Sequence, residues 1–142
     1  EAAAAHQLPV IIHARKSQED ILQQIKASQF DRGGIMHAFN GSLQQAGKFI
    51  ELGFKLGFGG MLTFERSSKL RKLAASLPLT SLVLETDAPD MTVASHQGER
   101  NSPEYLPEVL QALADIRPEN IEDIAAQLYD NSVQVLRLPL DR

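Results

Sequence analysis

Short apolar runs alternate with amphipathic stretches along most of the chain. Four such runs predict strands, at residues 9–14, 34–39, 54–60 and 82–86, and the first predicts a strand buried on both faces. Between the runs, apolar residues recur at the three- and four-residue spacing of a helix that buries one side: Ile21, Leu22 and Ile25, then Leu43, Ala46, Phe49 and Ile50, then Leu70, Leu73, Ala74 and Leu77. This order predicts an α/β fold of four parallel strands with covering helices.

Residues that start or stop helices mark the boundaries of these elements. The Ser42-x-x-Gln45 pattern predicts a capping box. Gly53 is placed to end the second helix in a left-handed conformation, and Pro118 is expected to open the last helix. Small residues alternate with large ones in 54–60, so this strand has a glycine face that can admit a close neighbour or a ligand.

The composition limits which functions are plausible. The 142 residues, 43% hydrophobic and 23% charged, predict one globular domain with a core. The net charge of −4 excludes the overall positive field typical of non-specific nucleic-acid binding, so any such contact has to be local. With no cysteine, the good metal ligands are His, Asp and Glu. No apolar run is long enough to span a membrane, so the cytoplasm is expected, without a membrane partner.

Two observations predict that residues 1–142 form a single incomplete domain. Residues 1–7 (EAAAAHQ) have the composition of a helix but no N-cap, as at the tail of a helix that begins upstream. Four strands also do not close a (β/α) barrel, which typically needs eight strands and about 250 residues. The repeated units therefore form either an open doubly wound sheet or part of a barrel.

Polar residues stand where three of the predicted strands end. His13, His37 and Asp87 occupy these C-terminal ends, where (β/α) barrel enzymes place catalytic groups. Two imidazoles and a carboxylate that converge there predict an open divalent-metal site, which can acidify a bound water for hydrolysis. Either histidine taken singly is also consistent with a core residue bonded to backbone.

Glu85 shares a strand face with Asp87, because side chains two residues apart in a strand point the same way. Glu85 is therefore a candidate to orient a ligand histidine, and the alternative is a salt bridge to Arg15 or Lys55. Arg15 is equally suited to hold a substrate phosphate, since a guanidinium matches phosphate oxygens.

A polar loop at 89–102 follows the fourth strand. It is too long for a routine connection, which predicts a functional loop. Arg100 and Asn101, near its end, are further candidates for contact with a substrate phosphate, and the alternative for both is simple solvation.

Four motifs stand in order along the chain: PVIIHAR at 9–15, HAFNGS at 37–42, ETDAP at 85–89 and RNSP at 100–103. Together they resemble the motifs of the TatD-like deoxyribonucleases, metal-dependent hydrolases of the amidohydrolase superfamily. The resemblance covers essentially the whole chain. It implies the C-terminal part of a distorted TIM barrel, with the N-terminal strands missing.

The resemblance implies that His13 and His37 are metal ligands and that Asp87 is a metal ligand or the base acting on the attacking water. It also implies divalent metal ions (Mg, Mn or Zn), two in the intact protein, and DNA as substrate. The family's N-terminal H-x-H pair and bridging Glu are not among these residues. The chain alone is therefore expected to be inactive, and to need its missing N-terminal segment or another chain to complete the barrel.

Three hypotheses follow from these patterns. The first is a divalent-metal-dependent hydrolase that cleaves phosphodiester bonds of DNA with metal-activated water. The second is an amide or ester hydrolase for a small molecule, because nearly the same site serves both reactions. The third is a chain without chemistry of its own, either a stable remnant or a half-barrel completed by another chain.

Overall fold

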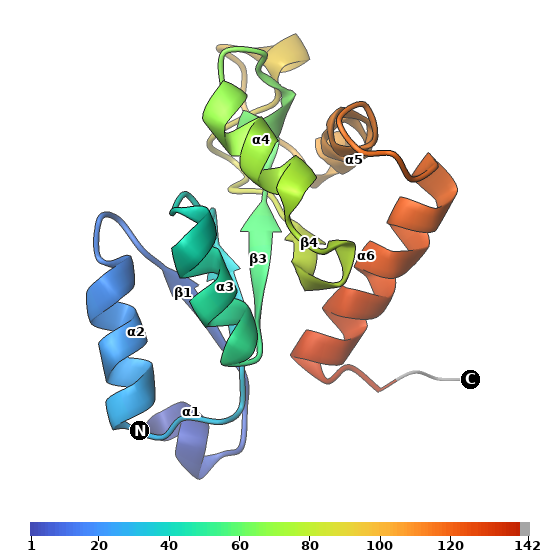
Figure 1. Ribbon diagram of the computed structural model, residues 1–142. Coiled ribbons are helices and arrows are strands. Elements are labelled where there is room, and N and C mark those ends of the chain that lie inside the picture. Colours follow the sequence, from blue (N-terminus) through green and yellow to red (C-terminus); the bar gives the residue numbers. More distant parts are fainter. Residues whose placement is uncertain (140–142) are drawn as a thin grey trace.

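The computed structural model describes residues 1–139, which contain one four-stranded parallel sheet (Figure 1). The strands lie side by side in chain order, as β1 (Val10–His13), β2 (Gly34–His37), β3 (Phe54–Phe58) and β4 (Leu82–Leu84). Parallel neighbours need a crossover, and a helix lies in each of the three connections. The predicted α/β fold with four parallel strands is confirmed.

Within the described residues, helices pack mainly against one face of this sheet. The α-helices are α1 (Ala2–Ala5), α2 (Gln18–Ala27), α3 (Leu43–Glu51), α4 (Ser68–Ser76), α5 (Leu106–Ala114) and α6 (Ile121–Leu136). Short 3₁₀ helices are η1 (Gly60–Thr63), η2 (Leu79–Ser81), η3 (Ala94–His96) and η4 (Pro103–Tyr105). Figure 1 shows α2 and α3 side by side along the sheet, and α5 and α6 beyond β4. Between residues 1 and 139, no helix combines the length and the apolar character needed to cross a membrane.

The predicted capping box of α3 is confirmed. Ser42 Oγ accepts a hydrogen bond from Gln45 N at 3.1 Å, and Gln45 Oε1 accepts one from Ser42 N at 3.1 Å. Gly53 has the predicted left-handed conformation, with φ +82°. The predicted start of the last helix at Pro118 is wrong. Helix α6 begins at Ile121 because the side chain of Asn120 caps it, a preference that Asn has at this position.

The larger core lies between the helices and one face of the sheet. Met36, Leu56, Phe58 and Leu82 are at most 1% exposed and belong to this core. Their partners from the helices are also buried, and include Leu22, Ile25, Ala46, Phe49, Leu73, Val109, Leu113 and Ile124. Burial of apolar surface stabilises by about 25 cal/mol per Å², so this layer holds β2, β3 and β4 in a fixed arrangement.

The opposite face of the sheet is only partly covered. Ile35 and Val83 pack there against Val135, near the end of α6. Ile11 is 65% exposed, so the prediction that its strand is buried on both faces is wrong. The reason is that β1 is an edge strand and nothing in residues 1–139 covers this part of it. Leu43, expected in the buried stripe of α3, is 57% exposed because it stands at the first position of the helix.

Arg117 joins the end of α4 to the connection between α5 and α6. Its side chain is 6% exposed, and Nη1 donates to the carbonyls of Ala74 and Leu77, both at 2.8 Å. Ala74 lies in the last turn of α4 and Leu77 is its C-cap residue, and at this end a helix leaves acceptors without internal partners. Nη2 lies 2.8 Å from Glu119 Oε1, and this hydrogen bond lowers the pKa of Glu119.

Replacement of Arg117 by alanine is therefore expected to lower the free energy of unfolding by about 3 kcal/mol, because buried carbonyls lose a charged donor. Arg32 is the matched control, since its guanidinium is more exposed and, among residues 1–139, pairs only with the adjacent Asp31, at 2.7 Å. The change Arg32→Ala should cost less than about 1 kcal/mol. Urea unfolding followed by circular dichroism measures both, and equal losses would contradict the role given to Arg117.

Candidate functional site

His37, the last residue of β2, lies between two carboxylates that follow β4. Its Nδ1 lies 2.9 Å from Oε2 of Glu85, and its Nε2 lies 2.7 Å from Oδ1 of Asp87. Both carboxylates approach the same ring, as their two-residue spacing predicted. The imidazole is therefore held at both nitrogens by one short segment of chain.

Strand β3 lies between the two strands that supply these groups, and its glycines make the contact possible. The pairing of Met36 with Leu56 places Gly57 level with His37. A Cβ on Gly57 would overlap the carboxylate of Glu85, so this carboxylate occupies the space that a side chain would fill. The glycine face predicted for this strand thus admits a close neighbour, and the neighbour is Glu85.

Glu85 has a second partner in the backbone after β2. Its Oε1 accepts a hydrogen bond from the N–H of Ala38 at 2.5 Å. Ala38 has a φ of +47°, a left-handed conformation that is uncommon for a residue with a side chain. Two hydrogen bonds, one from the His37 imidazole and one from the backbone N–H of Ala38, therefore fix the Glu85 carboxylate.

The cations that were considered as partners of Glu85 lie elsewhere. Lys55 Nζ donates to the carbonyl of Thr80 at 2.6 Å, and burial lowers the pKa of its ammonium. The predicted alternative of a salt bridge from Glu85 to Lys55 or Arg15 is therefore wrong. Arg15 and Arg100 are both exposed, beyond β1 and in the loop after β4, and their contact with a substrate stays a prediction.

Asn101 stabilises the long loop through buried hydrogen bonds. It is 4% exposed, and its Nδ2 donates to the carbonyls of Asp90 at 2.8 Å and Met91 at 3.3 Å. Its side chain is thus occupied by the loop itself. Asn101 thus holds the segment that follows Asp87, and its contact with a substrate phosphate stays a prediction.

The three predicted metal ligands lie at the carboxyl ends of strands β1, β2 and β4. The ring centroids of His13 and His37 are 5.6 Å apart, and His13 is exposed. No three His, Asp or Glu side chains among residues 1–139 are arranged to hold a metal ion. His37 and Asp87 bond directly to each other, and they offer the nitrogen and oxygen donors that divalent cations accept. The residues present therefore fit part of a divalent-metal site.

The two carboxylates change the acid–base behaviour of His37. Burial alone lowers the pKa of His37, but the charges of Glu85 and Asp87 and the hydrogen bonds to them outweigh it, so the pKa is raised. Burial raises the pKa of Glu85, against the opposing effects of His37 and the Ala38 N–H. A raised folded-state pKa of a histidine stabilises the fold fully below the unfolded value of about 6.5, and this stabilisation is lost as pH rises through the folded-state value.

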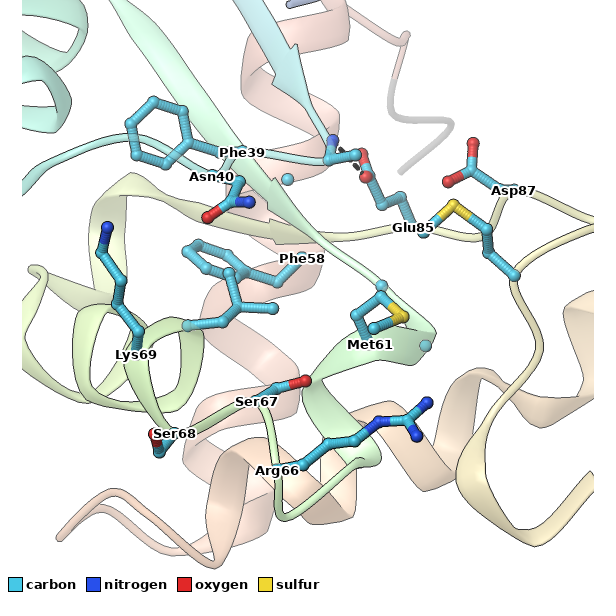
Figure 2. Close-up of a pocket in the computed structure, with 16 residues that line it drawn as sticks. Phe39, Asn40, Phe58, Met61, Arg66, Ser67, Ser68, Lys69, Glu85 and Asp87 are labelled. Carbon is cyan, nitrogen blue, oxygen red and sulfur yellow. Dashed lines mark hydrogen bonds between the residues drawn. The ribbon is translucent and has the colours of Figure 1, made fainter. Parts of the chain in front are cut away.

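A cavity of about 380 Å³ lies beside the two carboxylates. Figure 2 shows Glu85 and Asp87 on one side of it and Lys69 on the opposite side, while Arg66 stands apart from both, below Met61 in this view. The cavity walls also include Phe39, Asn40, Phe58, Met61, Ser67, Ser68 and Leu70. Neither cation was among the site residues predicted from the sequence. The available signal was a basic and serine-rich helix start soon after the glycine-rich strand.

Comparison with known proteins identifies the family of this chain. The family model described as TatD related DNase matches residues 1–137. The chain belongs to this family. The resemblance found in the four motifs is thereby confirmed.

Two curated relatives have closely similar sequences, and both are named uncharacterized metal-dependent hydrolases. The relative YjjV of Escherichia coli (strain K12) is 42% identical over 137 residues, which are 96% of this chain and 53% of that protein. The relative from Haemophilus influenzae is 44% identical over 128 residues, which are 90% of this chain and 49% of that protein. The chain spans about half the length of the curated relatives it matches.

Solved structures support the fold. The crystal structure of YjjV, a TatD homolog from Escherichia coli K12, matches with a TM-score of 0.91 and 42% identity, over 96% of this chain and 53% of that one. A TatD family hydrolase from Entamoeba histolytica matches with a TM-score of 0.77 at 22% identity, over 92% of this chain and 51% of that one, and this shows the fold alone. The predicted fold, part of a (β/α) barrel, is confirmed.

The change Glu85→Gln should lower the pKa of His37, because it removes a negative charge next to Nδ1. The stabilisation contributed by protonated His37 is then lost at a lower pH than in the original chain. Titration of the imidazole by NMR, without added metal, measures this pKa directly. An unchanged pKa would contradict the contact between His37 and Glu85.

The change Gly57→Ala tests the same contact through sterics, with the charge of Glu85 retained. The new Cβ displaces the carboxylate, so the pKa of His37 should again fall. Gly47 in α3 is the matched control, because a Cβ added there meets nothing within 4 Å. A fall of the same size in Gly47→Ala would mean that the effect does not come from Glu85.

Proposed function

We propose that this protein is a divalent-metal-dependent hydrolase that cleaves phosphodiester bonds of DNA. The observation that carries the proposal is the His37 imidazole, held between Glu85 and Asp87 at the strand ends of a TatD-family fold. The names of the relatives support metal-dependent hydrolysis. The description of the family supports DNA as the substrate.

Each residue of the site has a stated task in this proposal. His37 Nε2 and a carboxylate oxygen of Asp87 would hold a divalent cation, which is Mg, Mn or Zn. His13, from the adjacent strand, would be a further ligand. The intact site would hold a second cation. A bound divalent cation lowers the pKa of water and offsets the charge on phosphoryl oxygens. Glu85 accepts the Nδ1–H of His37, which leaves the lone pair on Nε2. Asp87 also accepts a proton from the attacking water.

A DNA substrate has to be recognised locally, because the chain has a net charge of −4. The exposed guanidinium groups of Arg15 and Arg100 stand after β1 and β4, the strands at the two edges of the sheet. In the proposal they contact phosphates that flank the one being cleaved.

The full-length gene product should degrade DNA in the presence of Mg²⁺ or Mn²⁺, and His37→Ala should abolish this activity. Glu85→Gln should reduce it about 10- to 100-fold, the usual cost of losing the partner that orients a ligand histidine. His6→Ala is the control, because His6 is an exposed residue at the end of α1. Equal activity of the original protein and His37→Ala would contradict the proposed function.

A second candidate is hydrolysis of an amide or ester in a small molecule. The observation in its favour is the cavity next to Asp87, whose size of about 380 Å³ is typical of small-molecule sites. A panel of amides, esters and phosphodiesters assayed with the same full-length protein separates the two candidates. Turnover of amides or esters without DNA degradation would favour the second.

We also propose that a further segment, upstream or from another chain, completes the sheet. Within the described residues β1 and β4 each pair with one neighbour, and Ile11 is 65% exposed. Open edges and an uncovered apolar side chain favour association. Residues 1–142 alone should therefore associate in sedimentation experiments or melt without cooperativity. The mass of a single chain combined with cooperative melting would contradict the need for completion.

A further inference from the structure

His96 lies in the long loop after β4, and three neighbouring side chains hold its imidazole in one orientation. The ring stacks on Tyr105 of η4, with 4.0 Å between the ring centroids and 9° between the ring planes. Its Nδ1 lies 2.8 Å from Oε2 of Glu99, and its Nε2 lies 3.8 Å from Oε1 of Glu108 in α5. The imidazole therefore joins the tip of the loop to η4 and α5.

The groups around His96 are themselves anchored to other parts of the fold. Ser95 Oγ donates a hydrogen bond to Oε2 of Glu108 at 2.5 Å, which fixes this carboxylate beside the imidazole. The N–H of Ala94 donates to Oγ1 of Thr63 at 2.8 Å, so the segment just before His96 is attached to η1. The loop thus meets fixed partners on both sides of His96.

His96 and Glu99 are also the first and last residues of a tight turn. The N–H of Glu99 donates to the carbonyl of His96 at 2.9 Å. Between them, Gln97 has φ −58° and ψ 125°, and Gly98 has φ +90°. These are the angles of a type II β-turn, which favours glycine at its third position. The contact between the two side chains spans the same four residues, so it stabilises the turn.

Arg100 follows this turn and stands between two residues whose positions are fixed. Glu99 is held by the turn on one side. On the other side, the N–H of Asn101 donates at 2.8 Å to the carbonyl of Pro89, two residues after Asp87. The backbone of Arg100 is therefore held next to the segment that follows Asp87, while its side chain is exposed. Among the ion pairs of residues 1–139, none includes Arg100.

We propose that His96 is a positioning residue, which orders the turn before Arg100 so that this guanidinium meets a phosphate of the substrate. The inference rests on the proposed phosphodiesterase function and deepens it, because Arg100 there contacts a phosphate that flanks the scissile one. Ordering a long side chain and its loop on binding costs affinity, and a backbone that is already fixed on both sides reduces this cost. His96 itself contacts Glu99 and acts through it.

The test measures binding of a short single-stranded DNA oligonucleotide to the full-length gene product by fluorescence anisotropy, with a chelator present so that no cleavage occurs. His96→Phe keeps a flat ring on Tyr105 but removes both nitrogens, and it should weaken binding about three- to tenfold. Arg100→Gln should weaken binding about tenfold, the usual loss for one charged hydrogen bond. With Arg100 already replaced, His96→Phe should cause no further loss, because both changes remove the same contact.

Two further variants separate positioning from a general disturbance of the loop. The amide of Asn is a hydrogen-bond donor close to the backbone, as Nδ1 is, so His96→Asn should restore most of the affinity that His96→Phe loses. Gln97→Ala is the matched control, because Gln97 is an exposed residue of the same turn. It should change the affinity by less than about twofold.

DNA degradation by the same variants supplies a second measurement. In His96→Phe the KM for DNA should rise while kcat stays unchanged, as expected when a contact common to the bound substrate and the transition state is weakened. A fall of kcat without a change in KM would overturn the proposal, because His96 would then support the reacting groups instead of Arg100.

The proposal is also overturned if His96→Phe binds the oligonucleotide as tightly as the original protein, or if it weakens binding equally with and without Arg100. Failure of the proposed function is a separate result: the protein then degrades no DNA with Mg²⁺ or Mn²⁺, while binding of the oligonucleotide still depends on His96 and Arg100.

Discussion

Two hydrogen bonds to a single imidazole organise the strand ends of this protein. His37 comes from β2, and Glu85 and Asp87 come from the chain just after β4, so the contact crosses the whole width of β3. It forms because Gly57 of β3 lies level with His37, and the carboxylate of Glu85 occupies the space that a side chain at this position would fill. A buried carboxylate is costly without partners, and this one has both an imidazole and a backbone N–H.

The two faces of the sheet have different tasks. One face is packed against helices and fixes the strands, and the other carries His37 and Glu85 and is covered by Val135 only around Ile35 and Val83. In a closed (β/α) barrel the second face would be the interior. The exposure of Ile11 and His13 on this side agrees with a chain that spans about half the length of its curated relatives.

Local signals in the sequence predicted the helices, strands and turns well. Burial and side-chain contacts, which depend on the neighbouring elements in the fold, were harder to predict from the sequence. The capping box at Ser42 and the turn at Gly53 involve residues close in sequence, so they could be identified directly. The exposure of Ile11 was missed because apolar character in a strand does not reveal whether anything covers it. The partner of Glu85 remained open between a histidine and a cation, because the order of strands in the sheet decides which of them it reaches.

The cavity was even harder to predict from the sequence, because residues far apart in the chain form its walls. Two of its lining residues, Arg66 and Lys69, are basic residues near a helix start, which in the sequence resemble any solvated pair of charges. They become candidates only when the fold brings them to the walls of the cavity that Asp87 also lines. By contrast, Asn101 belonged to a recognised motif, and its buried hydrogen bonds show that a motif residue can serve the loop that carries the site.

In the proposed function, His37 and Asp87 form the cation-binding end of this site while Glu85 orients His37. The most direct test is anomalous diffraction from crystals of the full-length gene product soaked in Mn²⁺. The account predicts an anomalous peak bonded to His37 Nε2 and an Asp87 oxygen, with Glu85 still bonded to Nδ1. A peak elsewhere, with His37 and Asp87 still hydrogen-bonded to each other, would contradict it.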